Sequence, residues 1–326
     1  MREKSSDLHV QAATIGIHIV DILGRPVSAI PSGQGMTLLD EIAMSAAGTA
    51  AATAYGLARL GVATATFGVI GNDDLGSWLR NRLQEEGVDV HGLHSASGVP
   101  TSATILPIRP DGSRPALHCI GANRLLDEHV IDFDVIKKAR HVHIGGSFLL
   151  ERLDGTPTAR ILKYAKEHGA TTSVDVIGVP DADFERVLGQ VYPWIDYFLP
   201  NEEDALMLSH SSSLHDAIRW FHGRGVRSTV ITLGERGASV SEQGREEAVV
   251  PAYAVDVVDT SGCGDAFSAG FISGIIRGKS PVDAALIGTA AGSATAQGLG
   301  SSAGVKNEKE LEEFMANTPY LGELRA

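Results

Sequence analysis

The residues best suited to chemistry in this sequence lie in one run, residues 257–271. An apolar run ending at Val258, expected to form a strand, leads into a turn that holds Gly262 and Gly264, and a helical pattern follows from Cys263. The first turn of a helix has unpaired backbone N–H groups and a partial positive charge. Glycines there remove side chains that would keep an anion away from the backbone. Residues 262–264 are therefore predicted to form an anion-binding turn.

Asp265 follows this turn directly. A carboxylate in the first turn stabilises a helix by itself, so a purely structural role is open. If a phosphoryl group occupies the turn, the same carboxylate can accept the proton of an attacking hydroxyl. The local sequence is therefore compatible with phosphoryl transfer to a hydroxyl, with Asp265 as the general base and residues 262–265 as the anion hole, and also with a helix that is only capped.

The elements that must position this turn alternate between strand-like and helix-like runs. The alternation predicts an α/β fold in which helices cover a mainly parallel sheet. The expected strands are Ala13–Ile19, Ala63–Val69, His141–Ile144, Thr171–Val176, Tyr197–Leu199 and Ser228–Thr232. The expected helices are Thr49–Leu60, Asp74–Glu86, Thr156–His168, Asp183–Gln190, Glu202–Leu208, Leu214–Gly223, Cys263–Arg277, Pro281–Gly298 and Glu308–Met315.

Two segments, at about 23–46 and 98–122, interrupt this alternation. The first is extended and of mixed polarity, and the second has two alternating runs around a turn at Pro110-Asp111-Gly112, which is typical of a β-hairpin. Together they predict a small antiparallel sheet inserted into a single domain of residues 1–326, where it would act as a lid over a site. Exposed edge strands tend to pair, so a homodimer formed through the lid is also open.

The composition excludes several classes of partner. A net charge of −13 disfavours nucleic acid and anionic membranes, because both require a basic surface. Cys119 and Cys263 are far apart, which disfavours a disulfide framework and a zinc site. No apolar stretch reaches the length of a membrane span. We expect a cytoplasmic protein that acts on a small molecule.

The full run Asp259-Thr260-x-Gly262-x-Gly264-Asp265-x-Phe267 resembles the C-terminal signature of the PfkB/ribokinase family of carbohydrate kinases. The run Gly68 to Gly76 is similar to that family's N-terminal signature, and the resemblance extends from about Thr14 to Val305. It implies a ribokinase-like three-layer αβα core with a small β-sheet lid. It also implies ATP-dependent phosphorylation of a sugar hydroxyl, with Mg²⁺ as cofactor.

The resemblance assigns roles to further residues, position by position. It implies that Asp204 holds Mg²⁺ through water and that Asp259 is a ligand for a monovalent cation such as K⁺. It makes Cys263 a spacer that contributes only its backbone to the turn. Plainer interpretations stay open, with Asn201 as a helix N-cap and the glycines as turn residues. The substrate-binding candidates are Asp21, Gly48, Asn123 and, on the hairpin, Arg114, and the nucleotide-binding candidates are Asn201, Thr232, Gly234, Gly237 and Thr289.

The match departs from the family at the expected acceptor site. Ala47 and Ala52 stand where the family has a glycine and an asparagine, and alanine cannot bind a sugar hydroxyl as that asparagine does. A nucleoside acceptor is therefore open beside a free sugar. A non-catalytic sugar or nucleotide sensor of the same fold is disfavoured, because a sensor has no need of Asp265. A dinucleotide-dependent dehydrogenase is excluded, because no Gly-x-Gly-x-x-Gly follows the first strand.

Overall fold

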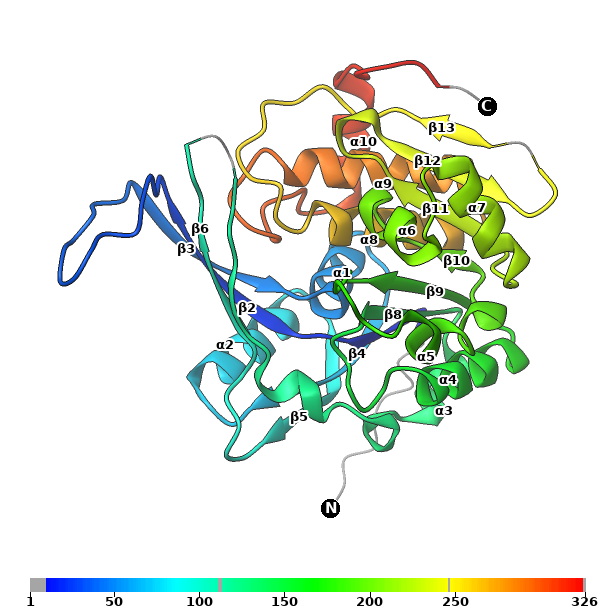
Figure 1. The fold of residues 1–326 in the computed structure, drawn as a ribbon, viewed down its shortest axis with the longest axis horizontal. Coiled ribbons are helices and arrows are strands. Elements are labelled where there is room, and N and C mark those ends of the chain that lie inside the picture. The colour runs from blue at the N-terminus through cyan, green and yellow to red at the C-terminus, as the bar shows by residue number, and fades with distance from the viewer. Residues whose placement is uncertain (1–9, 111–112, 246, 325–326) are drawn as a thin grey trace.

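A computed structural model of the protein describes residues 10–110, 113–245 and 247–324. Its centre is a nine-stranded sheet with the order β13-β12-β11-β10-β9-β8-β1-β4-β5 (Figure 1). All pairs from β11 to β5 are parallel, and β12 and β13 add two antiparallel pairs at one edge. The strands are β1 (Ala12–Gly16), β4 (Thr64–Gly71), β5 (Asp89–Ala96), β8 (His141–Ser147), β9 (Thr171–Val176), β10 (Tyr197–Phe198), β11 (Ser228–Thr232), β12 (Ala238–Glu242) and β13 (Ala248–Val250).

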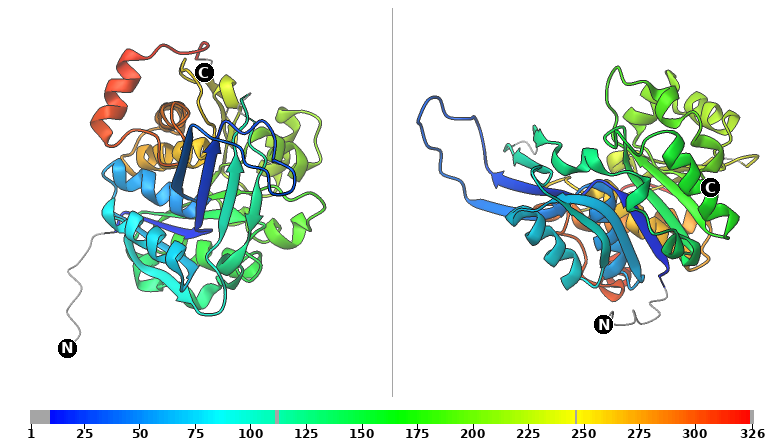
Figure 2. Two further views of the ribbon diagram at one scale, coloured as in Figure 1. Left: turned by 90° about the vertical axis from the view of Figure 1, so that its left-hand side faces the viewer. Right: turned by 90° about the horizontal axis from the view of Figure 1, so that it is seen from below.

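Helices cover both faces of this sheet and form the two outer layers (Figure 2). One layer holds α1 (Thr49–Arg59), α2 (Asp74–Glu85), α8 (Cys263–Ile276), α9 (Pro281–Thr295) and α10 (Glu308–Asn317). The other holds α3 (Phe133–Lys138), α4 (Thr156–Glu167), α5 (Phe184–Leu188), α6 (Glu202–Ser209) and α7 (Leu214–Gly223). Short 3₁₀ helices lie at Gly121–Leu125, Glu128–Val130, Tyr192–Trp194 and Gly234–Arg236. The three-layer αβα core with a mainly parallel sheet is confirmed.

Burial on both faces explains why the central strands are so apolar. Every residue of β1, β4 and β8 is buried, as expected for parallel strands covered by helices on both sides. The main apolar core includes Ile15, Val142 and Ile144 from these strands. This rigid sheet fixes the carboxyl ends of its strands, where parallel α/β proteins bind their ligands.

A second, four-stranded sheet projects from the body with the order β3-β2-β6-β7 (Figure 1). Its strands are β2 (Ile19–Arg25), β3 (Glu41–Ala47), β6 (Ala103–Pro107) and β7 (Leu117–Cys119), and we call this sheet the lid. The β2–β3 and β6–β7 pairs are antiparallel, but β2 and β6 run parallel. The expected small antiparallel sheet is therefore present, with one parallel pair, because β2 continues directly from β1 and meets β6 in the same direction. The expected turn at Asp111 and Gly112 lies outside the described residues.

Four elements of the core were not predicted: β5, β12, β13 and α3. The sequences of β5 and β12 carry polar residues at half or more of their positions, and β13 has only three residues. Their strand conformation comes from pairing with a neighbouring strand that is already in place, and local propensity does not show this. None of the helices in the described part of the chain is both long and apolar enough to cross a membrane.

Candidate active site

The expected anion-binding turn forms the N-terminus of α8. Gly262 is the N-cap residue, with a positive φ of 72°, and a side chain there would overlap Ser301. At Gly264, by contrast, an added Cβ would meet no atom within 4 Å. Protein packing therefore requires glycine at 262 and leaves open space beside 264. That space lies at the positive end of a 14-residue helix, where an anion is stabilised.

Asp265 lies in the first turn of α8, beside this space. Burial, together with the negative charge of Asp21, raises the pKa of its carboxyl to about 7, although Arg114 acts in the opposite direction. A carboxyl group with a pKa near neutrality can exchange a proton at physiological pH, which suits a general base. Burial also raises the pKa of the neighbouring Cys263 thiol to about 12, so this cysteine is a neutral thiol.

Asp21 extends from β2 on the inner face of the lid. Burial raises the pKa of its carboxyl to about 6, while a hydrogen bond from Thr104 and the charge of Arg114 lower it. Thr104 lies opposite Asp21 on β6, and its hydroxyl group also contacts His118 Nδ1 at 3.0 Å. Two carboxyl groups with raised pKa values, those of Asp21 and Asp265, thus face the same region from the lid and from the body.

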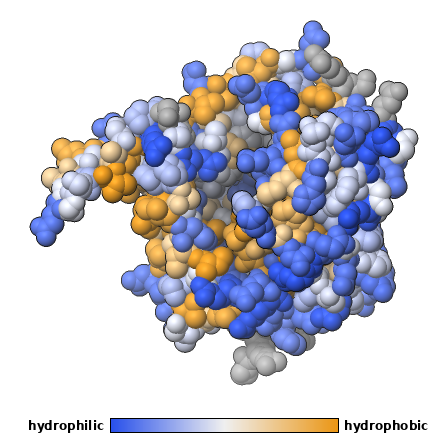
Figure 3. Space-filling view, in the orientation of Figure 1, coloured by the Kyte–Doolittle hydropathy of each residue, from blue (hydrophilic) through white to orange (hydrophobic). Residues whose placement is uncertain are grey.

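Arg114, also on the lid, reaches the turn before α8. Its Nε donates to Thr260 Oγ1 at 3.1 Å, and its Nη2 donates to the Thr260 carbonyl at 3.4 Å. The same Nε lies 4.0 Å from Asp259 Oδ1. Figure 3 shows the surface hollowed between the lid and the body, and Arg114 bridges the two sides of this region.

The carboxylate of Asp259 holds the residues around the anion-binding turn in place through hydrogen bonds. One of its carboxylate oxygens accepts hydrogen bonds from the backbone N–H of Ser261 at 2.9 Å and from the Ser261 hydroxyl at 2.8 Å. The other accepts from the Gly300 N–H at 2.8 Å. These three donors satisfy a carboxylate that is almost fully buried. A monovalent cation is not needed to explain its burial, and the sequence-based expectation of K⁺ at Asp259 gains no support from these contacts.

Asn201 and Asp204 form a capping pair at the start of α6. Asn201 Oδ1 accepts the Asp204 N–H at 2.8 Å, and Asn201 Nδ2 donates to Asp204 Oδ2 at 2.8 Å. Burial raises the pKa of the Asp204 carboxyl to about 6. The N-cap interpretation of Asn201 is therefore confirmed. The side chain of Asp204 provides a carboxylate beside the site. Mg²⁺ is bound by carboxylates of this kind, either directly or through a water molecule.

Asp175 belongs to the same region and was missed by sequence analysis. It lies in β9 near the carboxyl end of that strand and accepts the Val176 N–H at 2.7 Å. Burial, and then the charges of Asp265 and Asp204, raise the pKa of its carboxyl well above the usual range. An acidic residue near the carboxyl end of a buried parallel strand was the available signal. Among the described residues, no three His, Cys, Asp or Glu side chains converge closely enough to hold a metal ion by themselves.

A cavity of about 570 Å³ extends from the anion-binding turn along α9. At one end it is lined by Thr260, Cys263 and Gly264. Its other lining residues include all but one of the nucleotide-binding candidates, namely Thr232, Gly234, Gly237 and Thr289. A side chain at Gly237 would collide with the Val250 carbonyl, so turn geometry alone requires that glycine. Asn201, the remaining nucleotide-binding candidate, lies beside this cavity wall and forms an isolated bridge with Thr232 of β11.

Two of the substrate-binding candidates, Asn123 and Gly48, have structural roles in the fold. Asn123 is fully buried, its Oδ1 accepts the His18 N–H at 3.0 Å, and its Nδ2 donates to the His18 carbonyl at 3.1 Å. We therefore revise Asn123 from a substrate contact to a residue that fixes the chain between β1 and β2. Gly48 is the N-cap of α1. Ala47 and Ala52 beside it are buried and offer no polar side-chain group, as the sequence indicated.

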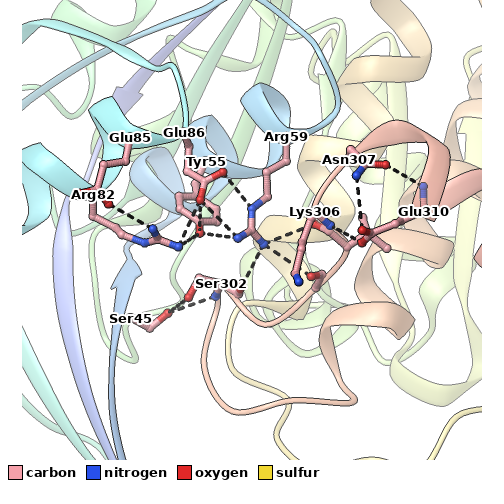
Figure 4. A network of polar contacts seen from close by, with 12 residues as sticks. Ser45, Tyr55, Arg59, Arg82, Glu85, Glu86, Ser302, Lys306, Asn307 and Glu310 are labelled. Carbon is pink, nitrogen blue, oxygen red and sulfur yellow. Dashed lines mark hydrogen bonds and ion pairs between the residues drawn. The ribbon is translucent and has the colours of Figure 1, made fainter.

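The loop after α9 is held by a polar network centred on Arg59 (Figure 4). The guanidinium of Arg59 donates to the Ser302 carbonyl at 2.9 Å and to the Val305 carbonyl at 3.3 Å, and it pairs with Glu86 at 3.2 Å. Ser302 is joined in turn to the lid, because its N–H donates to Ser45 Oγ at 3.1 Å. This loop also carries Gly300 and Ser301, which contact Asp259 and Gly262. Arg59 thus supports the anion-binding turn from a distance.

Comparison with known proteins defines the class of this chain. The family model of the pfkB family carbohydrate kinases matches residues 11–308. The ribokinase of Haemophilus influenzae is 27% identical over 82% of this chain and 86% of its own length. A probable fructokinase-6 of Arabidopsis thaliana, chloroplastic, is 30% identical over 83% of this chain and 73% of its own.

A solved structure extends this likeness to three dimensions. An E. coli protein assigned as a ribokinase II, in complex with ATP and Mg²⁺, superposes with a TM-score of 0.80 at 25% identity. The superposition covers 94% of this chain and 99% of the other. The chain belongs to the pfkB family of carbohydrate kinases, as its two signature motifs indicated. It is a carbohydrate kinase with the ribokinase fold.

Proposed function

We propose that this kinase transfers the terminal phosphoryl group of Mg·ATP to a hydroxyl of a sugar or sugar-like small molecule. The observation that carries the proposal is the position of Asp265. Its carboxyl has a pKa of about 7 and lies in the first turn of α8, directly after Cys263 and Gly264, which line one end of the 570 Å³ cavity. A base, an anion-binding turn and a cavity of nucleotide size therefore meet at one point.

In this proposal the chain binds the nucleotide in that cavity. The base and ribose lie along Thr232 to Gly237 and against α9, and the phosphates extend toward Gly264. The backbone of residues 262–264 then stabilises the charge that develops on the transferred phosphoryl group. Bound Mg²⁺ would neutralise phosphate charge. Asp204 would hold it through water, with Asp175 as a second nearby carboxyl group, which fits the preference of Mg²⁺ for one or two carboxylates and phosphate.

The acceptor lies between Asp21 and the lid in this proposal. Asp21 accepts a hydrogen bond from an acceptor hydroxyl, and Arg114 completes the site from the hairpin. Asp265 accepts the proton of the attacking hydroxyl as the new bond to phosphorus forms. Contact between the lid and the body excludes water, which limits hydrolysis of ATP.

An assay of ADP release tests this proposal. Mg·ATP is combined with free sugars, sugar acids, sugar phosphates and nucleosides, and Asp265→Asn is measured beside the wild type. We expect acceptor-dependent turnover that falls by about 10²- to 10⁴-fold in the variant, because the variant cannot accept the proton. Turnover of Asp265→Asn at the wild-type rate would refute the mechanism. Turnover with nucleosides alone would establish the nucleoside alternative.

We further propose that the outer face of the lid joins a second copy of the chain. Strand pairing places Met44, Ile22, Ile105 and Leu117 in one row across this face. Ile42 lies on the same face, and Ile42, Ile105 and Leu117 are all more than half exposed. The polar residues of the lid lie on its inner face, and the outer face carries this row of exposed apolar side chains. Such a row is typical of a protein–protein interface. The second copy would cover the outer face of the lid, opposite the inner face that carries Asp21.

A further inference from the structure

The C-terminal segment 318–324 folds back onto the cavity that we assign to the nucleotide. The Ala254 N–H donates to the Pro319 carbonyl at 2.8 Å, and the Leu321 N–H donates to the Ala252 carbonyl at 2.8 Å. Between these two bonds, Tyr320 forms an antiparallel bridge with Tyr253. The segment is therefore held as a short strand-like extension and has a defined position.

Aromatic packing reinforces this attachment. The rings of Tyr253 and Tyr320 are 4.6 Å apart, and their hydroxyl groups are 3.3 Å apart. Phe314 of α10 lies 5.3 Å from the Tyr253 ring, which is itself almost fully buried. Aromatic pairs at these distances stabilise their contacts beyond the apolar area that they bury. Tyr253 also lines the cavity, so the anchor of the segment is part of the cavity wall.

Leu321 is the residue of this segment that reaches the cavity. It lines the cavity together with Ala252 and Gly234, while Thr260 and Gly264 line the region beside the anion-binding turn. The Leu321 residue is 56% exposed and also lines a neighbouring cavity with Leu233 and Pro251, so part of its apolar surface is available to a ligand in the nucleotide cavity. If phosphates bind at Gly264, the remaining apolar part of the cavity accommodates the nucleoside part of the ligand. A flat apolar base in that part would cover the Leu321 side chain.

We propose that Leu321 is a nucleotide-binding residue and that segment 318–322 forms one wall of the nucleotide site. The proposal rests on the proposed function, because it takes the cavity as the site of ATP. The match to the family model ends at residue 308, so this wall lies beyond the part of the chain that defines the family. The wall would tune the affinity for the nucleotide, independently of the chemistry at Asp265.

The test compares Leu321→Ala with Leu324→Ala. Leu324 is a matched control, because it lies on the same segment at a similar exposure of 49% and is not among the described residues that line the cavity. ATP binding is measured by titration calorimetry without acceptor, and KM values are then measured for ATP and acceptor. We expect Leu321→Ala to raise the Kd and the KM for ATP about fivefold, from lost apolar contact. We expect kcat and the acceptor KM to stay within about twofold, and Leu324→Ala to match the wild type.

A third variant distinguishes the loss of contact between Leu321 and the nucleotide from an effect of the substitution on folding. Leu321→Met keeps the apolar volume, so it should bind ATP nearly as well as the wild type if the contact matters. Equal ATP affinity in Leu321→Ala, Leu324→Ala and the wild type would overturn this proposal and leave the proposed function intact. Failure of the wild type itself to bind ATP would overturn the proposed function. The two failures are therefore distinguishable in one set of titrations.

Discussion

Arg114 of the lid donates a hydrogen bond to the hydroxyl of Thr260, 146 residues later in the chain and two residues before the glycine that caps α8. This contact places a positive charge beside three carboxylates, those of Asp21, Asp259 and Asp265. The lid therefore contributes to the electrostatics of the base as well as to the enclosure of the site. The position of the lid and the basicity of Asp265 should be coupled.

Arg114→Ala should shift the pH dependence of the reaction. Arg114 lowers the pKa of Asp265, so its removal raises that pKa and moves the rise in activity to higher pH. We also expect kcat/KM for the acceptor to fall by about 10- to 100-fold, because the lid loses its contact with Thr260. Arg109→Ala is the control, since Arg109 is exposed on the same hairpin. An unchanged pH profile in Arg114→Ala would contradict the coupling.

The wild-type enzyme should gain activity as pH rises through neutrality. Asp265 must be deprotonated to accept a proton, and burial raises its pKa to about 7. The profile of kcat/KM for the acceptor should therefore rise between about pH 5 and 8 with an apparent pKa near 7. A rise centred near pH 4, the ordinary range of an aspartate, would show that the protein does not perturb this carboxyl group.

Asp265→Asn should stabilise the fold at high pH while abolishing turnover. The folded-state pKa of Asp265 lies above its unfolded value of 3.8, so its contribution to stability is present below pH 4 and is lost as pH rises through 7. At pH 8 the wild type keeps a poorly solvated carboxylate, and asparagine removes that charge. We expect the Tm of the variant to exceed that of the wild type by about 2 °C or more at pH 8, with a smaller difference at pH 5. Calorimetry at the two pH values checks this, and a lower Tm at pH 8 would be inconsistent with it.

The sequence predicted the positions of the base and the anion-binding turn because both depend on local order. An apolar stretch, a glycine-rich turn and a helix follow one another within 15 residues, so their relation is visible in the chain. The strand expected at the apolar stretch is absent, because residues 251–262 form a loop with only an isolated bridge at Tyr253. The capping role of Asn201 was predictable for the same reason, and it is confirmed.

Residues that act across the fold could not be predicted in this way. Asp175 approaches Asp204 and Asp265 only because parallel strands bring their carboxyl ends together. Asn123 looked like a polar group available to substrate, yet tertiary packing directs its amide onto the backbone of His18. The approach of Leu321 to the cavity depends on the path of the chain after α10, for which the sequence carries no periodic signal.

Arg59→Ala should destabilise the protein more than the loss of a surface arginine does. The Arg59 side chain is only 11% exposed and satisfies carbonyl groups of Ser302 and Val305 while it neutralises Glu86. Its removal takes this donor away from the two carbonyl groups and leaves Glu86 with only Tyr55 and Arg82 as partners, which costs about 2–4 kcal/mol. Arg82→Ala is the control, since Arg82 also pairs with Glu86 but is more exposed, and its loss should cost under about 1 kcal/mol. Chemical denaturation gives both values, and equal values would contradict a special role for Arg59.

The row of apolar residues on the outer face of the lid should hold two copies of the chain together. Ile105 lies near the middle of this row, between Ile22 and Leu117, and is 53% exposed. A lysine there would place a charge in the centre of the interface, where charged residues are depleted. We therefore expect the wild type to be a dimer by light scattering coupled to gel filtration, and Ile105→Lys to be a monomer at the same concentration. Leu324→Lys adds the same charge to an exposed leucine away from the lid and should leave the dimer intact. A wild type that stays monomeric at high concentration would contradict a dimer formed through this face. Dissociation by both lysine variants would show that net charge, not the lid surface, controls assembly.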